Sequence, residues 1–481
     1  MDMITPEPRP AWIAGRPEQG ASTLTVHHPY DGSEVATVAV PGPEQVERAV
    51  SAAASVAKEF RRSSAHSRAA ALDHVSRVIA GRAEEIAEVI TAENGKPLKW
   101  ADAEVRRAVS VFRIAAEEAR RFSGDLQRLD TDPAGEGRLA LTRRVPRGPV
   151  LGIAPFNFPL NLVAHKVAPS LAVGAPIIVK PAPRTPLAAL ILGEILAETD
   201  LPEGAFSVLP LGNEETSALV ADPRLPVVSF TGSGPVGWSI SDSAPRKHVV
   251  LELGGNAAAV VLRDWPDPEG AAHRIATFGN YQAGQSCIAV QRVIVEREVA
   301  EEFVPALVEA VQSQQTGDPY DKNTDVGPVV DEAAAERIVA WIDEAVAAGA
   351  KILTGGKRDG ATVEPTVLTD VPPSTKAWSE EIFGPVLAVS IVEGIDEAFA
   401  SVNESAYGLQ AGVFTRDVHL AFYASTELEV GGVIIGDVPS YRADQMPYGG
   451  VKGSGVGREG VLAAMHDLTE ERVTVFTGID L

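Results

Sequence analysis

The sequence is poor in the residues that build disulfide frameworks, multi-ligand metal sites and membrane anchors. It holds one cysteine in 481 residues, which excludes an internal disulfide and any site that needs several cysteines. Its nine histidines show no HExxH motif or paired-ligand spacing, so we predict no metal site. No apolar run reaches the roughly 18 to 20 residues that span a bilayer, and the N-terminus lacks the pattern of a signal peptide. We therefore expect a cytoplasmic protein without membrane contact.

Positive charge is also scarce. Lysine and arginine number 42 against 65 aspartates and glutamates, which gives a formal net charge of −23. Nucleic-acid binding needs a basic face, so we expect no nucleic-acid partner, although a local cluster of arginines could still receive an anion. Hydrophobic residues make up 45% of the chain, as in ordinary globular proteins. A chain of this length is too long for one hydrophobic core and predicts two or three structural units.

The hydrophobic pattern changes its period along the chain. Residues 44–120 have helical spacing, and residues 123–146 combine turn residues with two alternating stretches, which predicts a projecting β-hairpin. From 148 to 253 short β-branched runs alternate with amphipathic helices, and a second such series runs from about 257 to 437. This alternation predicts parallel sheets covered by helices. The last strand, 471–478, would be an exposed edge, so we expect it to pair with the hairpin of a neighbouring subunit.

Cys287 is the first candidate for chemistry. It lies in the segment NYQAGQSCIAVQR, where Gly284 and the small Ser286 leave room around the sulfur. A thiol in such a position can act as a nucleophile. The alternative is a buried structural cysteine, because free cysteine often packs as a small hydrophobic residue.

Glu252 is the second candidate. It ends a predicted strand and precedes two glycines, at the sheet edge where open α/β sheets bind ligands, and there it could accept a proton. An ordinary acid at a strand end is the alternative. A third interpretation uses the GxGxxG pattern of Gly232, Gly234 and Gly237, which would make Glu252, twenty residues after Gly232, a ribose ligand. That motif is weak alone and follows about the fourth strand, but phosphate contact at its helix N-terminus is physically reasonable.

Several short motifs occur together in one order and spacing. The segments are Pro155-Phe156-Asn157-Phe158-Pro159, Lys180-Pro181, Phe230-Thr231-Gly232-Ser233, Leu251-Glu252-Leu253-Gly254-Gly255, Gly284-Gln285-Ser286-Cys287, Glu380-Glu381-Ile382-Phe383-Gly384-Pro385, Asn403 with Tyr407-Gly408-Leu409, and Pro447-Tyr448-Gly449-Gly450-Val451-Lys452. Over nearly its whole length the chain resembles the aldehyde dehydrogenase superfamily.

This resemblance implies an α/β fold of two Rossmann-like parallel-sheet domains with a β-hairpin for oligomerisation. Residues 1–122 and 147–253 would form the cofactor-binding domain and 254–438 the catalytic domain. Residues 123–146 and 439–481 would supply the oligomerisation hairpin, a substrate loop and the C-terminal strand. The assembly would be a homodimer or a homotetramer.

The resemblance also implies NAD(P)-dependent oxidation of an aldehyde to a carboxylic acid. Cys287 would attack the carbonyl, and the side-chain amide of Asn157 with the backbone N–H of Cys287 would hold the oxyanion. Glu252 would then activate the water that hydrolyses the thioester. In this family the GxGxxG-like stretch is not used in the ordinary Rossmann manner.

Cofactor contacts follow from the same resemblance. Lys180 would bond the adenosine ribose, Glu381 the nicotinamide ribose, and Phe383 would pack near the nicotinamide. Taken alone, Lys180 would more often be a solvated surface lysine, and Phe383, Pro155 and the glycines could be purely structural. The remaining residues expected around NAD or NADP are Thr231, Gly232 and Ser233 at the pyrophosphate, together with Ile153, Pro155, Phe156, Ala182, Pro183, Val236 and Leu253.

The sequence departs from the pattern of many NAD-preferring relatives after Lys180. They carry Glu three positions later, where this chain has Pro183. The carboxylate that would bond the ribose hydroxyls and repel a 2′-phosphate is missing, so NADP is admissible. Arg184 could add attraction for that phosphate or could point to solvent.

The identity of the aldehyde substrate is the part of the function that the sequence specifies least. The chain resembles the branch of phosphonoacetaldehyde, lactaldehyde and non-phosphorylating glyceraldehyde-3-phosphate dehydrogenases, and semialdehydes are also candidates. That branch places substrate contacts at positions occupied here by Arg107, His165 and Arg442, and we add Ser286 and Ile288 beside the nucleophile. Arginine suits a phosphonate or carboxylate because its planar fork binds two oxygens. Arg107 could equally be a helix-surface residue paired with an acid.

Three other functions remain as alternatives. An aldehyde dehydrogenase that passes its acyl group to coenzyme A or phosphate usually lacks the general-base glutamate, which is present here as Glu252. A thioesterase or esterase would use Cys287 without reducing a cofactor. A non-catalytic binding protein on the same fold would not need the Cys, Glu and Asn set.

Overall fold

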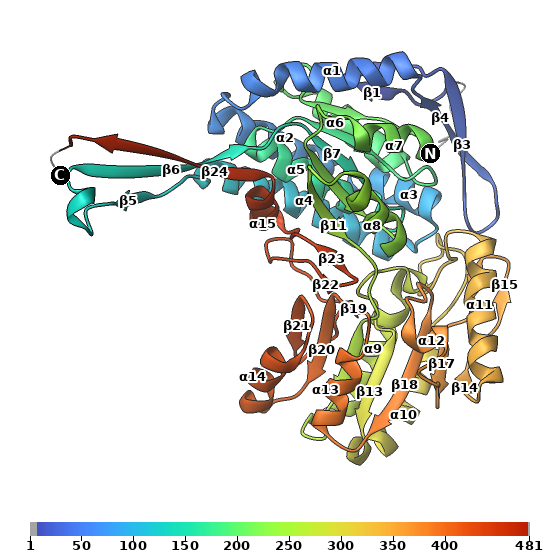
Figure 1. Cartoon of the computed structure of the whole chain (residues 1–481). Coiled ribbons are helices and arrows are strands. Elements are labelled where there is room, and N and C mark those ends of the chain that lie inside the picture. Colours follow the sequence, from blue (N-terminus) through green and yellow to red (C-terminus); the bar gives the residue numbers. More distant parts are fainter. Residues whose placement is uncertain (1–6, 480–481) are drawn as a thin grey trace.

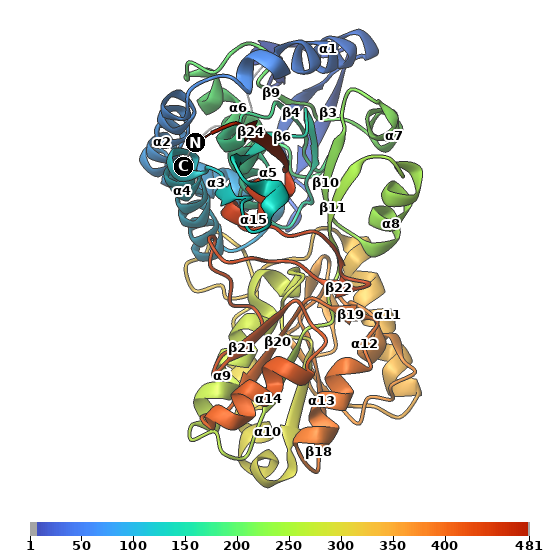
Figure 2. The ribbon, with the colours of Figure 1, turned by 60° about the vertical axis from the view of Figure 1, so that its left-hand side comes forward.

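Two parallel sheets form the two halves of the chain, and a three-stranded arm projects from the first half (Figure 1). The computed structural model describes residues 7–479. Figure 2 shows the two halves at opposite ends of the long axis, with β19 (Tyr407–Gly408) and β22 (Val451–Lys452) between them. No helix within residues 7–479 is long and apolar enough to cross a membrane. The predicted α/β architecture is confirmed.

The first sheet has the topology that creates a ligand site. Its five parallel strands have the order β9-β8-β7-β10-β11. The chain therefore passes from β7 through β8 to β9 on one side of β7, and then crosses back to form β10 and β11 on the other side of β7. Ligands of such sheets bind at the carboxyl ends of the strands where the order reverses. The strands are β7 (Val150–Ile153), β8 (Ile177–Lys180), β9 (Phe206–Val208), β10 (Val227–Thr231) and β11 (His248–Glu252), with antiparallel β1 (Ala11–Ile13), β2 (Arg16–Glu18) and β23 (Gly455–Val456) at the edges.

Helices cover both faces of this sheet. The parallel strands are buried and rich in Val, Ile and Leu, which is the pattern of strands shielded on both sides. All thirteen residues of α5 (Asn161–Val173) are buried, so this helix lies inside the protein rather than on its surface. The other helices are α1 (Pro43–Phe60), α2 (Ala65–Gly81), α3 (Ala83–Asn94), α4 (Leu98–Arg121), α6 (Leu187–Ala197), α7 (Asn213–Ala221), α8 (Gly234–Ser243) and α15 (Val461–Asp467).

The second half is built around a seven-stranded sheet with the order β14-β17-β18-β13-β12-β20-β21, parallel except for edge strand β14. Its strands are β12 (Ala258–Val261), β13 (Arg292–Glu296), β14 (Lys351–Thr354), β17 (Thr366–Thr369), β18 (Val386–Val392), β20 (Gln410–Phe414) and β21 (Gly432–Ile435). Its helices are α9 (Pro268–Asn280), α10 (Arg297–Gln312), α11 (Glu332–Ala347), α12 (Lys376–Ser379), α13 (Ile395–Asn403) and α14 (Val418–Glu427). A small hairpin joins β15 (Arg358–Asp359) and β16 (Thr362–Val363).

The arm contains the predicted hairpin, but its third strand has a different partner from the one expected. β5 (Leu126–Arg128) and β6 (Arg138–Pro146) pair antiparallel. β24 (Thr469–Thr477) then pairs with β6 of its own chain along all nine residues, from Thr469 opposite Pro146 to Thr477 opposite Arg138. The expectation that this strand is paired is confirmed, but its partner is the hairpin of its own chain and not that of a neighbouring subunit. Helix α15 returns the chain to the root of the hairpin, so the free edge of β6 is the nearest partner.

Two features were not predicted from the sequence. Residues before 44 form strands, of which β1 joins the edge of the first sheet and β3 (Ser22–His27) pairs with β4 (Glu34–Val40). In addition, β23 extends the first sheet from the C-terminal region, because Leu251 and Glu252 pair with Val456 and Gly455. The C-terminal region therefore contributes to the first half as well as to the arm.

A buried ion pair holds the start of α5. The side chains of Lys96 and Glu104 are both fully buried, and Lys96 Nζ donates a short hydrogen bond to Glu104 Oε2. Glu104 also accepts the backbone N–H groups of Leu160 and Asn161 at 2.9 and 3.0 Å, which caps the N-terminus of α5. Lys96 donates to the backbone oxygen of Asn157 at 2.8 Å. The pair therefore fixes the segment that connects β7 to α5.

We predict that Lys96→Met destabilises the fold by about 3 to 5 kcal/mol, because it leaves the Glu104 carboxylate buried without its cation. The melting temperature should fall by several degrees in thermal unfolding. Lys99→Met is the matched control, since Lys99 lies three residues away in a solvent-exposed pair with Asp325. Equal stability losses in the two variants would show that the buried pair has no special role.

Candidate active site

The residues expected at the site gather at the carboxyl edge of the first sheet, facing the second half. Asn157 follows β7, Ser233 follows β10, and Glu252 ends β11. Because β7 and β10 are neighbours on either side of the point where strand order reverses, their following loops enclose the same crevice. Cys287 reaches this crevice from the second half.

Cys287 stands on a constrained loop after α9. The preceding 3-10 turn, η2 (Tyr281–Gly284), holds Gln282 and Ala283 at φ values of 53° and 54° and Gly284 at 70°, which is the left-handed region. The sulfur is partly buried and lies 2.9 Å from the hydroxyl oxygen of Tyr448. Burial raises the pKa of the thiol to about 12, although the Tyr448 hydrogen bond opposes this. The resting sulfur is therefore a protonated thiol that needs a base before it can attack.

Asn157 is fixed by contacts on its backbone and its side chain. Its backbone oxygen accepts hydrogen bonds from Lys96 and from Gln282 Nε2 at 2.8 and 2.5 Å. Its side-chain Nδ2 donates to the carbonyl of Gln285 at 3.0 Å. An amide nitrogen carries two hydrogens, so one N–H remains for an oxyanion. The structure thus brings Asn157 to the loop that carries Cys287.

Glu252 is buried, and neither carboxylate oxygen has a hydrogen-bond partner among the described residues. Desolvation raises its pKa well above the ordinary value, and the charge of Glu459 adds to this rise, against Arg442 and Lys166. A Cβ at Gly449 would stand 2.8 Å from its Oε1, so the carboxylate packs against the glycine that follows Tyr448. A buried carboxyl without partners is costly in a structural role and is typical of a proton-transfer site.

Two residues that the sequence analysis missed complete this region. Lys166 and Glu459 are buried and lie 3.2 Å apart, and Arg442 Nη2 lies 3.1 Å from the other oxygen of Glu459. Burial alone would raise the pKa of Glu459, but Lys166 and Arg442 lower it to about 2. Glu459 is therefore ionised beside Glu252. A lysine within an otherwise almost wholly apolar helix was the available sequence signal for Lys166.

The same network corrects the role expected of Thr231. Its hydroxyl accepts from Lys166 Nζ at 2.7 Å and donates to Glu459 Oε1 at 3.2 Å. The side chain therefore faces the protein interior and is not directed toward a cofactor pyrophosphate. The backbone N–H of Gly232 is also used, because it donates to the carbonyl of Glu252 at 3.0 Å.

The expected substrate cations do not form one free cationic pocket. Arg107 donates to Asp444 Oδ1 at 3.1 and 2.8 Å, and His165 Nε2 lies 3.2 Å from the same oxygen. Burial and the charge of Arg442 lower the pKa of His165 to about 4, so this histidine is neutral near pH 7. The hypothesis of three convergent positive charges is corrected to two arginines, each facing one buried acid.

Arg442 is nevertheless placed beside the nucleophile. Its guanidinium lies 3.8 Å from the centroid of the Tyr448 ring, and its Nε has no hydrogen-bond partner among the described residues. The Tyr448 hydroxyl touches Cys287 in turn. Ser286 accepts a hydrogen bond from Tyr281 at 2.7 Å, while Ile288 packs with Leu409 and Tyr448. These side chains form the wall around the sulfur.

The N-terminus of α8 fits a phosphate group. Ser233 is the N-cap residue, is exposed, and makes no side-chain capping bond. A Cβ at Gly234 would meet nothing within 4 Å, and Val236 is half exposed. Unpaired backbone N–H groups at a helix start attract anions. Of the residues expected at the pyrophosphate, Ser233 has the geometry that suits the contact.

The residues expected at the adenosine ribose lie at and just after the end of β8. Lys180 ends β8 beside buried Ile153 of β7, and burial lowers its pKa to about 8. Ala182 is buried and Pro183 half-buried on the turn that follows. Arg184, considered above for a 2′-phosphate, instead has Nη2 2.5 Å from Asp331 Oδ2 in the second half. Arg184 therefore contributes an interdomain contact.

Two residues expected near the nicotinamide, Glu381 and Phe383, come from the second half. Glu381 accepts the backbone N–H of Gly255 at 3.0 Å, and burial raises its pKa to about 7. Phe383 has a φ of 52°, and its ring meets Phe156 edge-on with 5.9 Å between centroids. This contact brings Phe156, which follows β7, together with Phe383 across the crevice. Pro155 lies between Phe156 and the end of β7, and Leu253 follows Glu252 as a buried residue.

The family is established by comparison with known proteins. The model of the Aldehyde dehydrogenase family matches residues 16–474, so this chain belongs to that family. The resemblance inferred from the motifs is confirmed. The chain is an NAD(P)-dependent aldehyde dehydrogenase, an oxidoreductase that acts on small aldehydes.

Curated relatives share most of the chain. It is 41% identical over 465 residues to a 3-sulfolactaldehyde dehydrogenase of Priestia aryabhattai, which covers 96% of this chain and 97% of the relative. It is 37% identical over 396 residues to a lactaldehyde dehydrogenase of Methanococcus aeolicus, which covers 81% of this chain and 83% of that one.

Solved structures share the fold over nearly the full length. Aldehyde dehydrogenase 21 from Physcomitrella patens, in complex with the reaction product succinate, has a TM-score of 0.97 at 44% identity, with 99% of each chain covered. An NADP-dependent glyceraldehyde-3-phosphate dehydrogenase from Bacillus halodurans, complexed with NADP, has a TM-score of 0.94 at 35% identity, with 98% of this chain and 99% of that chain covered.

We predict that the Cys287 thiol of the free enzyme reacts slowly with iodoacetamide at neutral pH. Because its pKa is raised to about 12, the rate should continue to increase above pH 9. Mass spectrometry can follow the single alkylated site, since the chain has no other cysteine. A rate that levels off between pH 6 and 8 would contradict the protonated resting state.

Proposed function

We propose that this enzyme oxidises a small aldehyde that carries an anionic group, through a thioester on Cys287. The observation that carries the proposal is the buried Arg442 guanidinium beside Tyr448 and Cys287, with its Nε free of partners among the described residues. Arg107, whose side chain is 30% exposed, provides a second cation at Asp444. An anionic group of the substrate can therefore bind the two arginines in place of Asp444 and Glu459, or in addition to them.

The relatives support an acidic substrate. A sulfolactaldehyde carries a sulfonate, and succinate is a dicarboxylate, so both named compounds combine the reacting carbon with a second, anionic end. Arginine binds such groups through two parallel hydrogen bonds. The comparison does not select one aldehyde, because lactaldehyde, which is neutral, is named for another relative.

In the proposed mechanism, Glu252 first receives the proton of the Cys287 thiol. The raised pKa of the Glu252 carboxyl suits this step, because a general base is most effective when its pKa lies near the working pH. The thiolate then attacks the aldehyde carbon and forms a thiohemiacetal. The free N–H of Asn157 Nδ2 and the backbone N–H of Cys287 hold the oxygen as it becomes negative.

When bound, NAD or NADP would supply the acceptor for the hydride of the substrate carbon. Ser233 would hold its phosphates, Lys180 a ribose on the adenosine side, and Glu381 the nicotinamide ribose. Pro183 presents no carboxylate toward the adenosine ribose, so nothing at that position repels a 2′-phosphate. After the first proton has passed from Glu252 to solvent, the Glu252 carboxylate removes a proton from the water that attacks the thioester carbon, and it returns this proton to the Cys287 sulfur as the carboxylic acid leaves.

We also propose that the enzyme forms a homodimer or a homotetramer through the arm. Isolated strands with apolar, exposed side chains require a partner surface. The exposed apolar residues of the arm are Leu126, Leu141, Val473, Val475 and Phe476.

Glu252→Gln should slow thioester hydrolysis by about two to four orders of magnitude, which is the usual cost of losing a general base. Because Glu252 also accepts the thiol proton in this mechanism, formation of acylated Cys287 should slow as well, and intact-protein mass spectrometry of samples quenched at successive times after addition of aldehyde and cofactor separates the two steps. Cys287→Ala is the control that forms neither thioester nor reduced cofactor. Hydrolysis at the rate of the unmodified enzyme would assign Glu252 another role.

Arg107→Ala should raise KM for an anionic aldehyde and reduce kcat/KM about ten- to a hundredfold, because one charged hydrogen bond contributes roughly 1.5 to 3 kcal/mol. Activity toward a neutral short aldehyde should change little. Arg106→Ala is the matched control, since Arg106 is exposed and paired with Asp102 on the same helix. The anionic-substrate proposal fails if both aldehydes lose activity equally or if the unmodified enzyme prefers the neutral one.

A further inference from the structure

A basic cavity lies at the root of the arm, away from the crevice described above. It has a volume of about 570 Å³, and no acidic residue is among those that line it. Its arginines come from the α1–α2 connection, α2, β6 and β24. They are Arg61, Arg62, Arg68, Arg143, Arg144 and Arg472. A concentration of positive charge on a chain with a net charge of −23 requires an explanation.

Most of these arginines have no anionic partner within residues 7–479. Arg61, Arg62 and Arg143 form no ion pair there. Arg68 donates only to uncharged oxygens, among them the backbone carbonyl of Ala172 at 2.9 Å. Arg472 has its nearest carboxylate at 4.0 Å, on Glu470, which lies outside the cavity lining. The positive charge of the cavity is therefore largely uncompensated.

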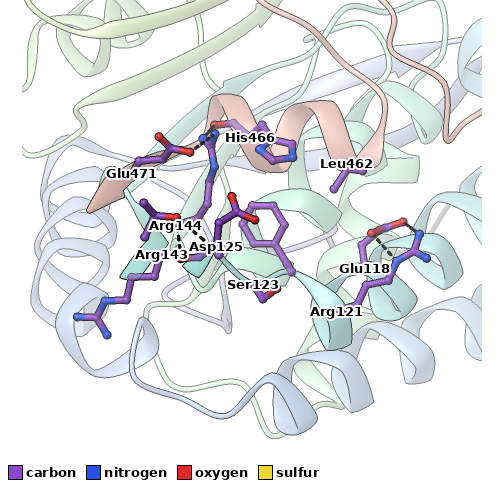
Figure 3. Close-up of a pocket in the computed structure, with 12 residues that line it drawn as sticks. Glu118, Arg121, Ser123, Asp125, Arg143, Arg144, Leu462, His466 and Glu471 are labelled. Atoms are coloured by element: carbon purple, nitrogen blue, oxygen red, sulfur yellow. Dashed lines mark hydrogen bonds and ion pairs between the residues drawn. The ribbon is translucent and has the colours of Figure 1, made fainter. Parts of the chain in front are cut away.

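The strand register brings two of the charges together. Arg143 of β6 and Arg472 of β24 are direct cross-strand partners, and such partners point to the same face of the sheet. Like charges in this arrangement are destabilising. Their neighbours Arg144 and Glu471 form an ion pair at 3.3 Å, so the charge of Arg144 is compensated. Figure 3 shows that pair, with the Arg143 side chain pointing away from it.

The cavity is also shaped for a molecule rather than for a single ion. Its volume falls within the range of small-molecule sites, which is roughly 300 to 1,000 Å³. Phe122, Val145, Pro146 and Val173 supply an apolar wall beside the arginines. Guanidinium groups match the paired oxygens of phosphate better than those of a simple halide.

We propose that this arginine cavity binds a small molecule with two or more phosphate groups, at a site separate from the NAD(P) crevice. The anion would be held between arginines of the body, Arg61, Arg62 and Arg68, and arginines of the arm, Arg143 and Arg472. It would relieve the repulsion between the two cross-strand arginines and fasten the arm to the body. Binding should therefore raise the melting temperature of the enzyme.

Inorganic pyrophosphate is the probe, and calorimetric titration of the full chain is the measurement. Saturating NADPH is present throughout, so the cofactor crevice is occupied. We expect one pyrophosphate per chain, with binding weakened at least about tenfold in Arg61→Glu/Arg143→Glu, because each lost charged hydrogen bond has an effect of that size. Arg138→Glu/Arg246→Glu changes the net charge equally at exposed arginines outside the cavity and should bind as the unmodified enzyme does.

Other results would overturn the proposal. Absence of pyrophosphate binding in the unmodified enzyme would do so, as would equal affinity in both double variants. A third contrary result combines two observations: pyrophosphate does not bind, and the oligomeric mass of the cavity variant in light scattering differs from that of the unmodified enzyme. The cavity would then be a contact surface between copies of this chain. If charge reversal prevents folding, Arg143→Gln, checked by circular dichroism, provides the same comparison with a smaller change.

Discussion

One buried anion organises the active site. Glu459 is held ionised between Lys166 and Arg442, and its negative charge raises the pKa of Glu252 beyond the effect of burial. Two neighbouring carboxyls thus have pKa values pushed in opposite directions, the arrangement that assigns one to structure and the other to proton transfer. The same anion receives the Thr231 hydroxyl from β10 and Lys166 from α5, so it also joins the central strand to the central helix. Loss of Glu459 would leave Lys166 and Arg442 buried without the carboxylate that pairs with both.

The two halves of the molecule supply complementary parts of the chemistry. The first sheet places Asn157, Glu252 and the α8 N-terminus at the edge where its strand order reverses, which follows from topology alone. The second half delivers Cys287 on a turn in left-handed conformation and Glu381 on the loop before β18. Contacts between the halves, such as Arg184 with Asp331 and Phe156 with Phe383, then determine how closely the two sets approach.

Local patterns predicted most of the fold but little of the side-chain pairing. Alternation of β-branched runs and helices located both sheets, because buried parallel strands have a distinctive composition. The short strands before residue 44 carry too weak a pattern to be distinguished from loops. The motifs predicted Cys287, Asn157 and Glu252 as one site, and the structure brings Asn157 to the loop that carries Cys287. The pairing of Arg107 with Asp444, and the inward turn of the Thr231 hydroxyl, arise from contacts between residues more than 200 positions apart. No local spacing encodes such contacts.

The arm joins two segments that lie far apart in the sequence, which has a consequence for folding. Its middle strand, β6, precedes the parallel strands of both sheets in the chain, whereas β24, which covers one edge of β6, follows them. Until the two strands meet, β6 has an unsatisfied row of backbone groups along that edge. Removal of β24 would keep every residue described at the crevice and would leave this edge of β6 open. Closing the arm therefore requires a long-range contact that local folding of either half does not supply.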